Sequence, residues 1–344
     1  MIDSHKPRSV LVTGGAGFIG ANFVEHLIET DPEVHVVNLD LLTYAGSEDN
    51  LRNVAASDRH ELIEGDITDA SLVNRLFAEK RIDTVVHFAA ESHVDRSITG
   101  PAAFISTNIV GTFTLLEAAR NAWLSDSNRP DARFHHVSTD EVFGSLAESD
   151  PPFNETTPYS PRSPYSASKA GSDHLVRAYH ETYGLPVTLT NCSNNYGPYQ
   201  HAEKFIPTVI RSALAEKPIP IYGQGLNIRD WLYVKDHCTA IDLVVRRGTN
   251  GATYLIGGKS ERRNIDIARE ICGILDECVP RASGKYADLL ASVTDRPGHD
   301  FRYAIDSSVI ESELGWKRSE TFATGIKKTV DWYLSNRQHF AGHE

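Results

Sequence analysis

The chain has 344 residues, of which 40% are hydrophobic and 23% are charged, an ordinary composition for a globular protein. Its formal net charge of −12 disfavours general nucleic-acid binding, although a locally basic pocket can still take an anionic small molecule. No apolar run approaches the ~20 residues that span a bilayer, and the N-terminus lacks the apolar core of a signal peptide. We therefore expect a cytoplasmic protein with no membrane or nucleic-acid partner.

The first half of the chain alternates β-branched runs with amphipathic stretches. The expected strands are Ser9–Thr13, Val34–Leu39, Glu61–Glu64, Thr84–Phe88, Phe134–Ser138 and Val187–Asn191. The expected helices are Ile19–Glu29, Ala70–Glu79, Ala102–Ala122 and Ser166–Tyr183. Near-continuous apolar strands separated by helices predict an α/β fold with a doubly wound parallel sheet, covered by helices on both faces.

The second half of the chain is less regular. Turns at Pro198, Pro218 and 223–225 precede helical periodicity near Asn264–Leu275 and Thr321–Leu334. We expect a smaller C-terminal α/β lobe that closes over the carboxyl edge of the sheet, where open α/β sheets place ligands. The expected boundaries are 1–193 for the sheet domain, with 226–256 returning to it, and 194–344 mainly for the lobe.

Four cysteines, Cys192, Cys238, Cys272 and Cys278, occur in the chain. None forms a C-x-x-C pair, and no histidine cluster completes a zinc site, so we expect no metal. We expect all four to be buried thiols in a reducing compartment.

A glycine-rich loop, Gly14–Gly20, connects the first expected strand to the first expected helix. Its pattern Gly15-x-Gly17-x-x-Gly20 permits a tight turn and close approach of the backbone to a pyrophosphate, which the helix N-terminus can bind. Asp40 ends the next strand, 20 residues beyond Gly20, where a carboxylate binds a ribose 2′-hydroxyl and repels a 2′-phosphate. The alternative is a glycine-rich turn and a surface aspartate. The context favours bound NAD over NADP.

Two further residues extend this expected NAD site. Asp66 and Ile67 follow the third strand, where an adenine ring is often held, although an Asp66 that caps the next helix would look the same. These features predict that residues 1–193 form an NAD-binding domain of the Rossmann type.

Tyr165 and Lys169 lie four residues apart on an expected helix and therefore share one face. A free tyrosine has a pKa near ~10, too high for an efficient base at neutral pH. A nearby ammonium and a positive nicotinamide ring would favour the phenolate and lower this pKa, and Lys169 could also bind the nicotinamide ribose. The alternative is a tyrosine and a lysine exposed on a helix surface. We expect a catalytic pair.

Residues Ser138–Gly144 emerge from a hydrophobic strand at the ligand-binding edge of the sheet. Because neighbouring residues of a strand point oppositely, Asp140 and Glu141 can serve one substrate only if the chain turns there, which Gly144 makes plausible. Burial and mutual repulsion would raise one pKa and keep that carboxyl protonated, so the pair could act as acid and base. Helix-capping or solvated charges are the alternative.

The sequence resembles the extended short-chain dehydrogenase/reductase family and, more narrowly, the dTDP-glucose 4,6-dehydratases, over nearly its whole length. The segments that carry the resemblance are Thr13–Gly20, Asp40–Gly46, Phe88–Asp95, Thr139–Gly144, Tyr165–Lys169, Asn191–Tyr199, Ile228–Val234 and Asp295–His299. The triplet Thr139–Glu141 is the specific part, because related epimerases usually have Ser or Ala with a hydrophobic residue there. Phe143 departs from the family, in which Tyr is common at this position.

The resemblance implies a mechanism for these residues. Tyr165 would take the proton from the sugar 4-hydroxyl, which Thr139 orients, while NAD accepts the C4 hydride. Glu141 would remove the C5 proton, and protonated Asp140 would donate to the departing 6-hydroxyl. The hydride would return to C6, giving a 4-keto-6-deoxy sugar with no net redox change.

The resemblance also implies the residues that hold the two ligands. With the glycine loop and the catalytic pair, the NAD site would comprise Gly14, Gly17, Phe18, Ile19, Gly20, Asp40, Leu41, Leu42, Thr43, Asp66, Ile67, Phe88, Ala89, Ala90, Glu91, Ser92, Thr107, Tyr165, Lys169 and Asn195. A nucleotide-diphosphate sugar would be bound by Ser92, Thr139, Asn194, Lys204, Phe205, Ile206, Pro207, Thr208, Val209, Pro220, Ile221, Tyr222, Arg229, Asn264, Asp295, Arg296, Pro297, Gly298 and His299. Arg229 and Arg296 suit a diphosphate because guanidinium groups bind oxyanions bidentately.

Three alternatives or additions stay open. A UDP-sugar 4-epimerase or decarboxylase would share NAD and the Tyr165–Lys169 pair but would not need Asp140. A non-catalytic NAD-binding regulator would be expected to lose Tyr165 or Lys169. The family suggests a homodimer through the helices near Ala102–Ala122 and Ser166–Tyr183, although their apolar faces could equally cover the sheet.

Overall fold

A computed structural model describes residues 4–125, 131–295 and 299–340. Its centre is a seven-stranded parallel sheet in the order β10-β6-β5-β4-β1-β2-β3. These strands are β1 (Ser9–Thr13), β2 (His35–Asp40), β3 (His60–Glu64), β4 (Thr84–His87), β5 (Arg133–Thr139), β6 (Val187–Cys192) and β10 (Thr253–Ile256). The expected first six strands all form, with ends that differ by one residue at most.

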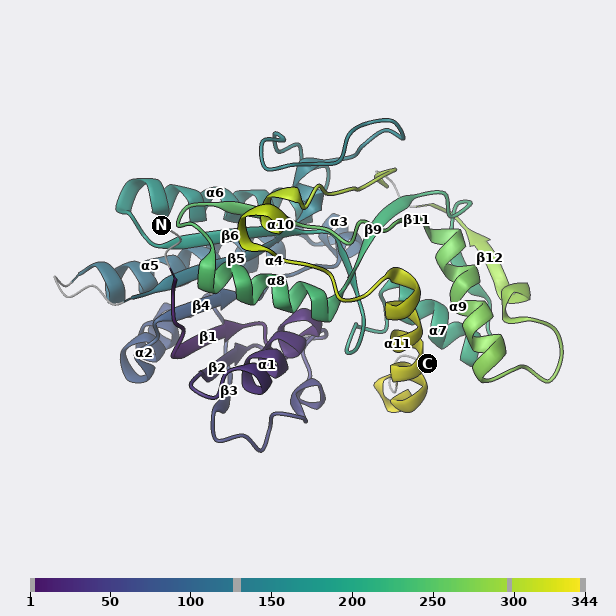
Figure 1. Ribbon diagram of the computed structural model, residues 1–344, viewed down its shortest axis with the longest axis horizontal. Coiled ribbons are helices and arrows are strands. Elements are labelled where there is room, and N and C mark those ends of the chain that lie inside the picture. Colours follow the sequence, from purple (N-terminus) through teal and green to yellow (C-terminus); the bar gives the residue numbers. More distant parts are fainter. Residues whose placement is uncertain (1–3, 126–130, 296–298, 341–344) are drawn as a thin grey trace.

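Helices cover both faces of this sheet (Figure 1). On one face, α1 (Phe18–Thr30) packs against α8 (Val234–Arg247), and α10 (Ser308–Leu314) joins the same core. On the other face lie α2 (Ala70–Lys80), α5 (Thr112–Leu124) and α6 (Pro164–Tyr183). The prediction of a Rossmann-type doubly wound sheet is confirmed, and α8 and β10 show the chain returning to it late.

A second lobe lies beside the sheet and has its own hydrophobic core (Figure 1). Its strands are β7 (Asn194–Tyr196), β9 (Ile228–Tyr233) and β11 (Glu261–Arg263) in one sheet, and β8 (Ile219–Tyr222) with β12 (Leu290–Val293) in another. Its helices are α7 (Phe205–Leu214), α9 (Asn264–Cys278) and α11 (Phe322–Ser335). Short elements complete the described fold: α3 (Val94–Thr99), α4 (Pro101–Phe104), η1 (Glu48–Leu51), η2 (Ile105–Gly111), η3 (Asp140–Phe143), η4 (Tyr286–Leu289) and η5 (Arg337–Phe340).

The expected helix Ala102–Ala122 differs from its prediction. It is interrupted by a π-helical segment, η2, between α4 and α5. The continuous stretch Pro101–Leu124 is long and apolar enough to cross a membrane by length and composition, so the expectation that no stretch reaches that length was wrong. Half of its most apolar 18-residue window is buried, because one face of the stretch packs into the core under the sheet.

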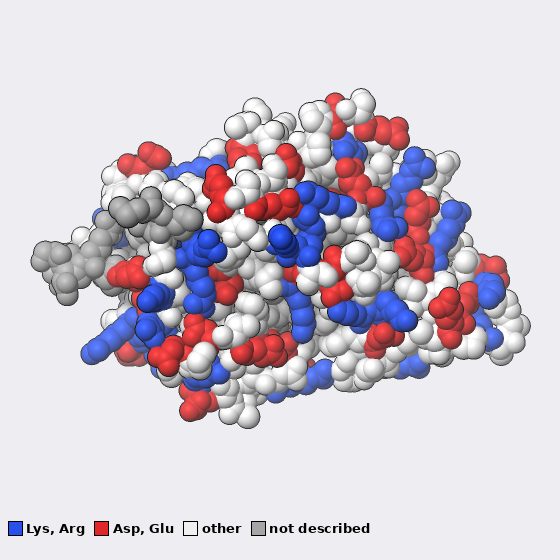
Figure 2. Space-filling view, viewed as in Figure 1, with Lys and Arg blue, Asp and Glu red and all other residues white. Residues whose placement is uncertain are grey.

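The structure also shows where the charged side chains and the cysteines lie. On the visible face, Lys and Arg are interspersed with Asp and Glu (Figure 2). Cys192, Cys238 and Cys272 are buried thiols, whereas Cys278, at the last turn of α9, is exposed, which corrects the expectation of four buried cysteines. Within residues 4–125, 131–295 and 299–340, no cluster of His, Cys, Asp and Glu is arranged to hold a metal ion.

Candidate active site

The glycine loop makes a tight turn between β1 and α1. Gly14 has φ +72°, and a Cβ there would lie 2.6 Å from the backbone nitrogen of Ala89. A Cβ on Gly20 would overlap the carbonyl oxygen of Gly14. Gly17 caps α1 and offers no side-chain acceptor, so the first amides of the helix remain available to an anion. The loop therefore fits a pyrophosphate that approaches the backbone closely.

A cavity of about 330 Å³ extends from this loop to the carboxyl ends of the neighbouring strands. Except for Leu42, every residue predicted for the NAD site lines it. So do the catalytic candidates Thr139, Asp140, Glu141, Tyr165 and Lys169. The structure thus brings the two predicted sets together in one space, large enough for a substantial part of a small-molecule ligand.

Asp40 ties the end of β2 to the glycine loop. Its Oδ2 accepts a hydrogen bond from the Ala16 amide at 2.9 Å, and its Oδ1 accepts one from the Leu42 amide at 2.9 Å. Burial raises the pKa of Asp40, while both amides oppose that rise. A carboxylate has further lone pairs for a ribose hydroxyl. Leu42, at φ +52°, forms part of this turn but does not line the cavity.

Asp66 lies at the same edge and does not cap α2. The cap is Asp69, whose Oδ1 accepts hydrogen bonds from the amides of Ser71 and Leu72. Asp66 instead accepts from the Thr68 amide and lines the cavity beside Ile67. The aspartate that caps α2 is therefore Asp69 and not Asp66. The binding of the adenine end of NAD by Asp66 stays a prediction.

Tyr165 and Lys169 lie in the first turns of α6, which begins with a capping box formed by Ser163 and Ser166. Lys169 is 4% exposed, and its Nζ donates a hydrogen bond to the carbonyl oxygen of Val137 at 2.8 Å. Burial raises the pKa of Tyr165 well above its ordinary value, the neighbouring charge of Glu141 raises it further, and a hydrogen bond with Thr139 opposes the rise.

The protein groups alone therefore shift the Tyr165 pKa upward, which is opposite to the expected direction. The reason is that desolvation of the phenolate outweighs the nearby favourable contacts. The groups expected to lower the value were the Lys169 ammonium and the positive charge of bound nicotinamide.

Asp140 and Glu141 follow β5 in η3, a single 3₁₀ turn capped by Thr139 and ended by Gly144 at φ +91°. The expected turn is present. Asp140 is 2% exposed, and its Oδ2 has no hydrogen-bond partner among the described residues. Burial, and then the charge of Glu141, raise the pKa of Asp140 well above its ordinary value, as predicted. The turn thus holds a buried carboxylic acid beside a second carboxyl group at the cavity.

The residues predicted to bind a sugar nucleotide are less gathered. Ser92, Thr139, Asn194 and Lys204 line the cavity. The remaining described members lie outside its lining, on the second lobe and adjoining chain: Phe205, Ile206, Pro207, Thr208, Val209, Pro220, Ile221, Tyr222, Arg229, Asn264, Asp295 and His299. Arg296, Pro297 and Gly298 lie outside the described residues.

Arg229 is buried in β9 rather than placed on a surface. Its Nη1 donates to the carbonyl oxygen of Ile228 at 2.7 Å, and its Nη2 donates to that of Asp300 at 2.9 Å. Its guanidinium carbon lies 4.2 Å from the ring centroid of Tyr303. The charge of Arg229 also lowers the pKa of Asp140, against the effect of burial. The diphosphate contact of Arg229 stays a prediction.

The cavity also includes residues that the sequence patterns did not assign to either ligand. These are Ala45, Gly46, Gly65, Val137, Ser138, Cys192, Ser193, Gln200 and His201, besides Leu39. Several lie within the segments Asp40–Gly46 and Asn191–Tyr199 that carry the family resemblance. Gln200 and His201 follow directly after the second of these segments, so extending it by one turn would have found them.

Comparison with known proteins places this site in a family. Residues 11–329 match the family model described as GDP-mannose 4,6 dehydratase. The chain belongs to this dehydratase family. A dTDP-glucose 4,6-dehydratase from Shigella flexneri is 57% identical over 337 residues, covering 95% of this chain and 93% of that protein.

Solved structures of the dehydratases are similar over the whole fold. The dTDP-glucose 4,6-dehydratase from Bacillus anthracis in complex with NAD is 41% identical, with a TM-score of 0.86, and the match covers 96% of this chain and 97% of that one. DesIV, a dTDP-glucose 4,6-dehydratase from Streptomyces venezuelae with NAD and TYD bound, is 46% identical, with a TM-score of 0.86 and coverage of 96% and 98%.

Proposed function

We propose that this dehydratase converts dTDP-glucose to dTDP-4-keto-6-deoxyglucose with NAD as its resident cofactor. Its relatives named dTDP-glucose 4,6-dehydratase reach 57% identity, and two similar structures contain NAD. The observation that carries the proposal is the buried Asp140 beside Glu141, facing the same cavity as Tyr165. The glycine loop, which has no side chains at its closest approaches, and the free amides at the start of α1 fit the pyrophosphate of NAD.

NAD, when bound, would accept a hydride from C4 and give it back at C6 after water has left, while a proton returns to C5. Tyr165 accepts the proton of the 4-hydroxyl, and Thr139 orients that hydroxyl. The resulting 4-ketone acidifies the C5 proton, which Glu141 removes. Asp140, kept protonated by burial, donates its proton to the departing 6-hydroxyl and releases water. The carboxyl pair thus provides the acid and the base that elimination of water requires.

The alternative functions receive less support. An epimerase or decarboxylase that shares Tyr165 and Lys169 has no use for a buried acid at Asp140. A non-catalytic regulator has no use for the intact pair at the cavity. The relatives between 53% and 57% identity carry the dehydratase name.

Mass spectrometry of dTDP-glucose and UDP-glucose, incubated separately with the protein, tests this proposal. We expect loss of one water from dTDP-glucose, faster than from UDP-glucose, with no net consumption of NAD. Unchanged substrate mass, or a mass loss that includes carbon dioxide, would overturn it.

We also propose a homodimer built on η2, α5 and α6. Ile105, Val110 and Phe113 are 47%, 44% and 45% exposed on η2 and α5, although the opposite face of this stretch is buried. An apolar stripe of this kind is typical of a protein interface. Light scattering should give twice the mass of the chain, and Val110→Asp combined with Phe113→Asp should give the single mass. A monomeric unsubstituted protein would contradict the proposal.

The division of labour and the compartment are proposals too. Residues 1–193, with the return at 226–256, would hold NAD, and residues 194–344 would mainly hold the sugar nucleotide. Removal of the nucleotide sugar should leave NAD bound, which the absorbance of the released cofactor measures. The four free thiols fit a reducing cytoplasm.

A further inference from the structure

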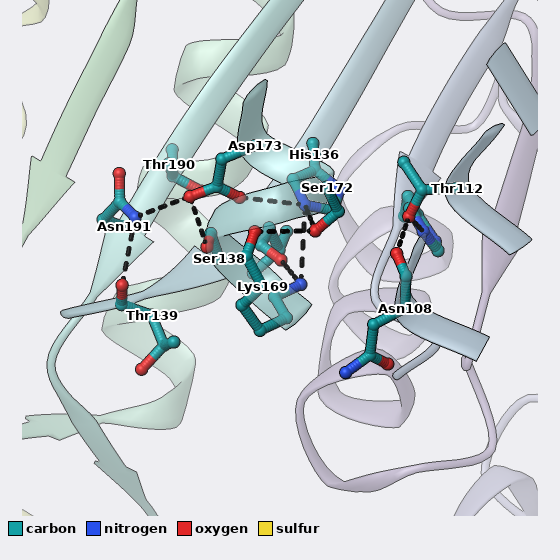
Figure 3. A network of polar contacts seen from close by, with 12 residues as sticks. Asn108, Thr112, His136, Ser138, Thr139, Lys169, Ser172, Asp173, Thr190 and Asn191 are labelled. Atoms are coloured by element: carbon teal, nitrogen blue, oxygen red, sulfur yellow. Dashed lines mark hydrogen bonds and ion pairs between the residues drawn. The ribbon is translucent and has the colours of Figure 1, made fainter. Parts of the chain in front are cut away.

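Asp173 lies fully buried on α6, one turn after Lys169. Three neighbours donate hydrogen bonds to its Oδ2: the hydroxyl of Ser138 at 2.8 Å, the hydroxyl of Tyr159 at 2.8 Å and Nδ2 of Asn191 at 3.3 Å. Figure 3 shows this carboxylate between Asn191, from β6, and Ser138 and His136, from β5. A buried carboxylate with this many donors is an ionised group held in a fixed place.

The contacts of Asp173 reach both halves of the catalytic group. On one side, Asn191 Nδ2 also donates to the carbonyl oxygen of Thr139 at 3.0 Å. On the other side, His136 Nε2 lies 3.2 Å from Asp173 Oδ1 and 3.5 Å from Lys169 Nζ (Figure 3). One carboxylate therefore joins the strand end that carries the acid–base turn to the lysine that faces the cavity.

The charges of this network support each other. Burial lowers the pKa of Lys169, and the charge of Asp173 is the largest effect that opposes the fall. Burial raises the pKa of Asp173, but the contact with His136, the charge of Lys169 and the hydrogen bond from Tyr159 together hold that pKa below its ordinary value. Burial and Lys169 lower the pKa of His136 to about 4, so this ring is neutral at neutral pH. The buried Lys169 ammonium and the buried Asp173 carboxylate therefore both face the same atom, Nε2, of a neutral imidazole.

We propose that Asp173 is a positioning residue that supplies the buried counter-charge of Lys169, one helical turn away, and fixes the backbone of Thr139 through Asn191. The kinetic part of this proposal rests on the proposed dehydratase function, in which Lys169 supports Tyr165. An ammonium in a buried site without a counter-charge loses its proton, because desolvation penalises the charged form. Asp173 thus sets the pH range in which Lys169 carries its charge.

Other groups that face this pair come from several elements. Cys192 on β6, whose own pKa is raised by burial, raises the pKa of Lys169. The charge of Lys169 in turn lowers the pKa of His87 on β4. Arg177 Nη2 donates a hydrogen bond to the Tyr159 hydroxyl at 2.8 Å, and this hydroxyl in turn donates to Asp173. These groups remain in place when the Asp173 charge alone is removed.

Asp173→Asn tests the charge with little change of shape. We expect the alkaline limb of the kcat profile to move about one pH unit or more toward lower pH, with NAD still bound. Tyr159→Phe is the matched control, because it removes one hydrogen bond to Asp173 and keeps the charge, so its alkaline limb should not move. A uniform fall of kcat in Asp173→Asn with an unmoved limb would overturn the proposal.

A denaturant-unfolding cycle tests the counter-charge without any activity measurement. Lys169→Met removes the buried counter-charge of Asp173 and should destabilise the protein, whereas adding Asp173→Asn should restore part of that stability. If Asp173→Asn alone folds poorly, adding Lys169→Met to it should likewise restore part of its stability. Additive losses, or a double variant that folds no better than either single one, would overturn the proposal even if the dehydratase function were wrong.

Discussion

The carboxyl edge of the large sheet and the second lobe place their predicted site residues differently. At the sheet edge, residues from the ends of β1, β2 and β5 and from the start of α6 line one cavity. In the second lobe, Phe205–Val209 and Pro220–Tyr222 lie outside that lining. Parallel topology alone gathers the first group, because the carboxyl ends of parallel strands meet at one edge. The predicted lobe residues belong to strands of two smaller sheets and to the helices α7 and α9, and they share no such edge.

The comparison suggests that the sheet edge performs the chemistry and the second lobe selects the substrate. Substitutions at the edge should therefore change kcat, and substitutions in the lobe should change KM.

Tyr165→Phe should have the largest effect. Removal of the phenolic proton acceptor should lower kcat by about 10²–10⁴-fold, with oxidation at C4 impaired and no accumulation of reduced cofactor. Stopped-flow absorbance and product mass spectrometry measure the two quantities. A variant with the unsubstituted rate would remove Tyr165 from the mechanism.

Glu141→Gln should stop the reaction one step later. Oxidation at C4 should still occur, but water elimination should slow by about 10²-fold or more, so reduced cofactor accumulates. Asp140→Asn is a useful partner variant, because it removes the acid and leaves the base. Dehydration at the unsubstituted rate in Glu141→Gln would contradict the role of this carboxylate.

Arg229→Gln tests the second lobe. Loss of charge-assisted contacts to a diphosphate should raise KM about tenfold, with a smaller change in kcat. Because Arg229 also binds the carbonyl oxygens of Ile228 and Asp300, its unfolding midpoint should be measured in parallel. A fall in kcat at constant KM would place Arg229 with the chemistry instead, through its effect on Asp140.

Gly20→Ala should have a smaller effect, on folding and cofactor retention. The new Cβ would overlap the carbonyl oxygen of Gly14, so we expect a loss of about 1–3 kcal/mol and weaker NAD binding. Gly273→Ala on α9 is the matched control, since no atom lies within 4 Å of the new Cβ. It should stabilise the protein by about 0.5–1 kcal/mol and leave NAD content unchanged. Urea unfolding and NAD absorbance distinguish the two variants.

Sequence patterns predicted the sheet edge well because its signals are local. The glycine loop, Asp40 and the turn at Asp140 each follow a recognisable strand. The network of Asp173 could not be predicted in this way, because it joins α6 to residues of β5 and β6 that are apart in the sequence. In the sequence, these residues form no recognisable motif, because a histidine within a strand and an aspartate within a helix are both common.

Two other misses have similar physical causes. The π-helical segment η2 includes Asn108, whose side chain binds the backbone of Glu91 and the hydroxyl of Ser168. Apolar periodicity carries no information about such contacts. The pKa of Tyr165 depends on full burial, which a Y-x-x-x-K spacing does not report.

The most direct test of the central claim follows the hydride. dTDP-glucose labelled with deuterium at C4 should give a product with deuterium at C6 of the same molecule, detected by NMR and mass spectrometry. In a mixture of unlabelled dTDP-glucose and dTDP-glucose that carries deuterium at C4 and a second isotope label elsewhere, the deuterium should not move to product molecules that lack the second label. Retention of deuterium at C4, or its loss from the sugar, would contradict an enzyme that returns the hydride within one catalytic cycle.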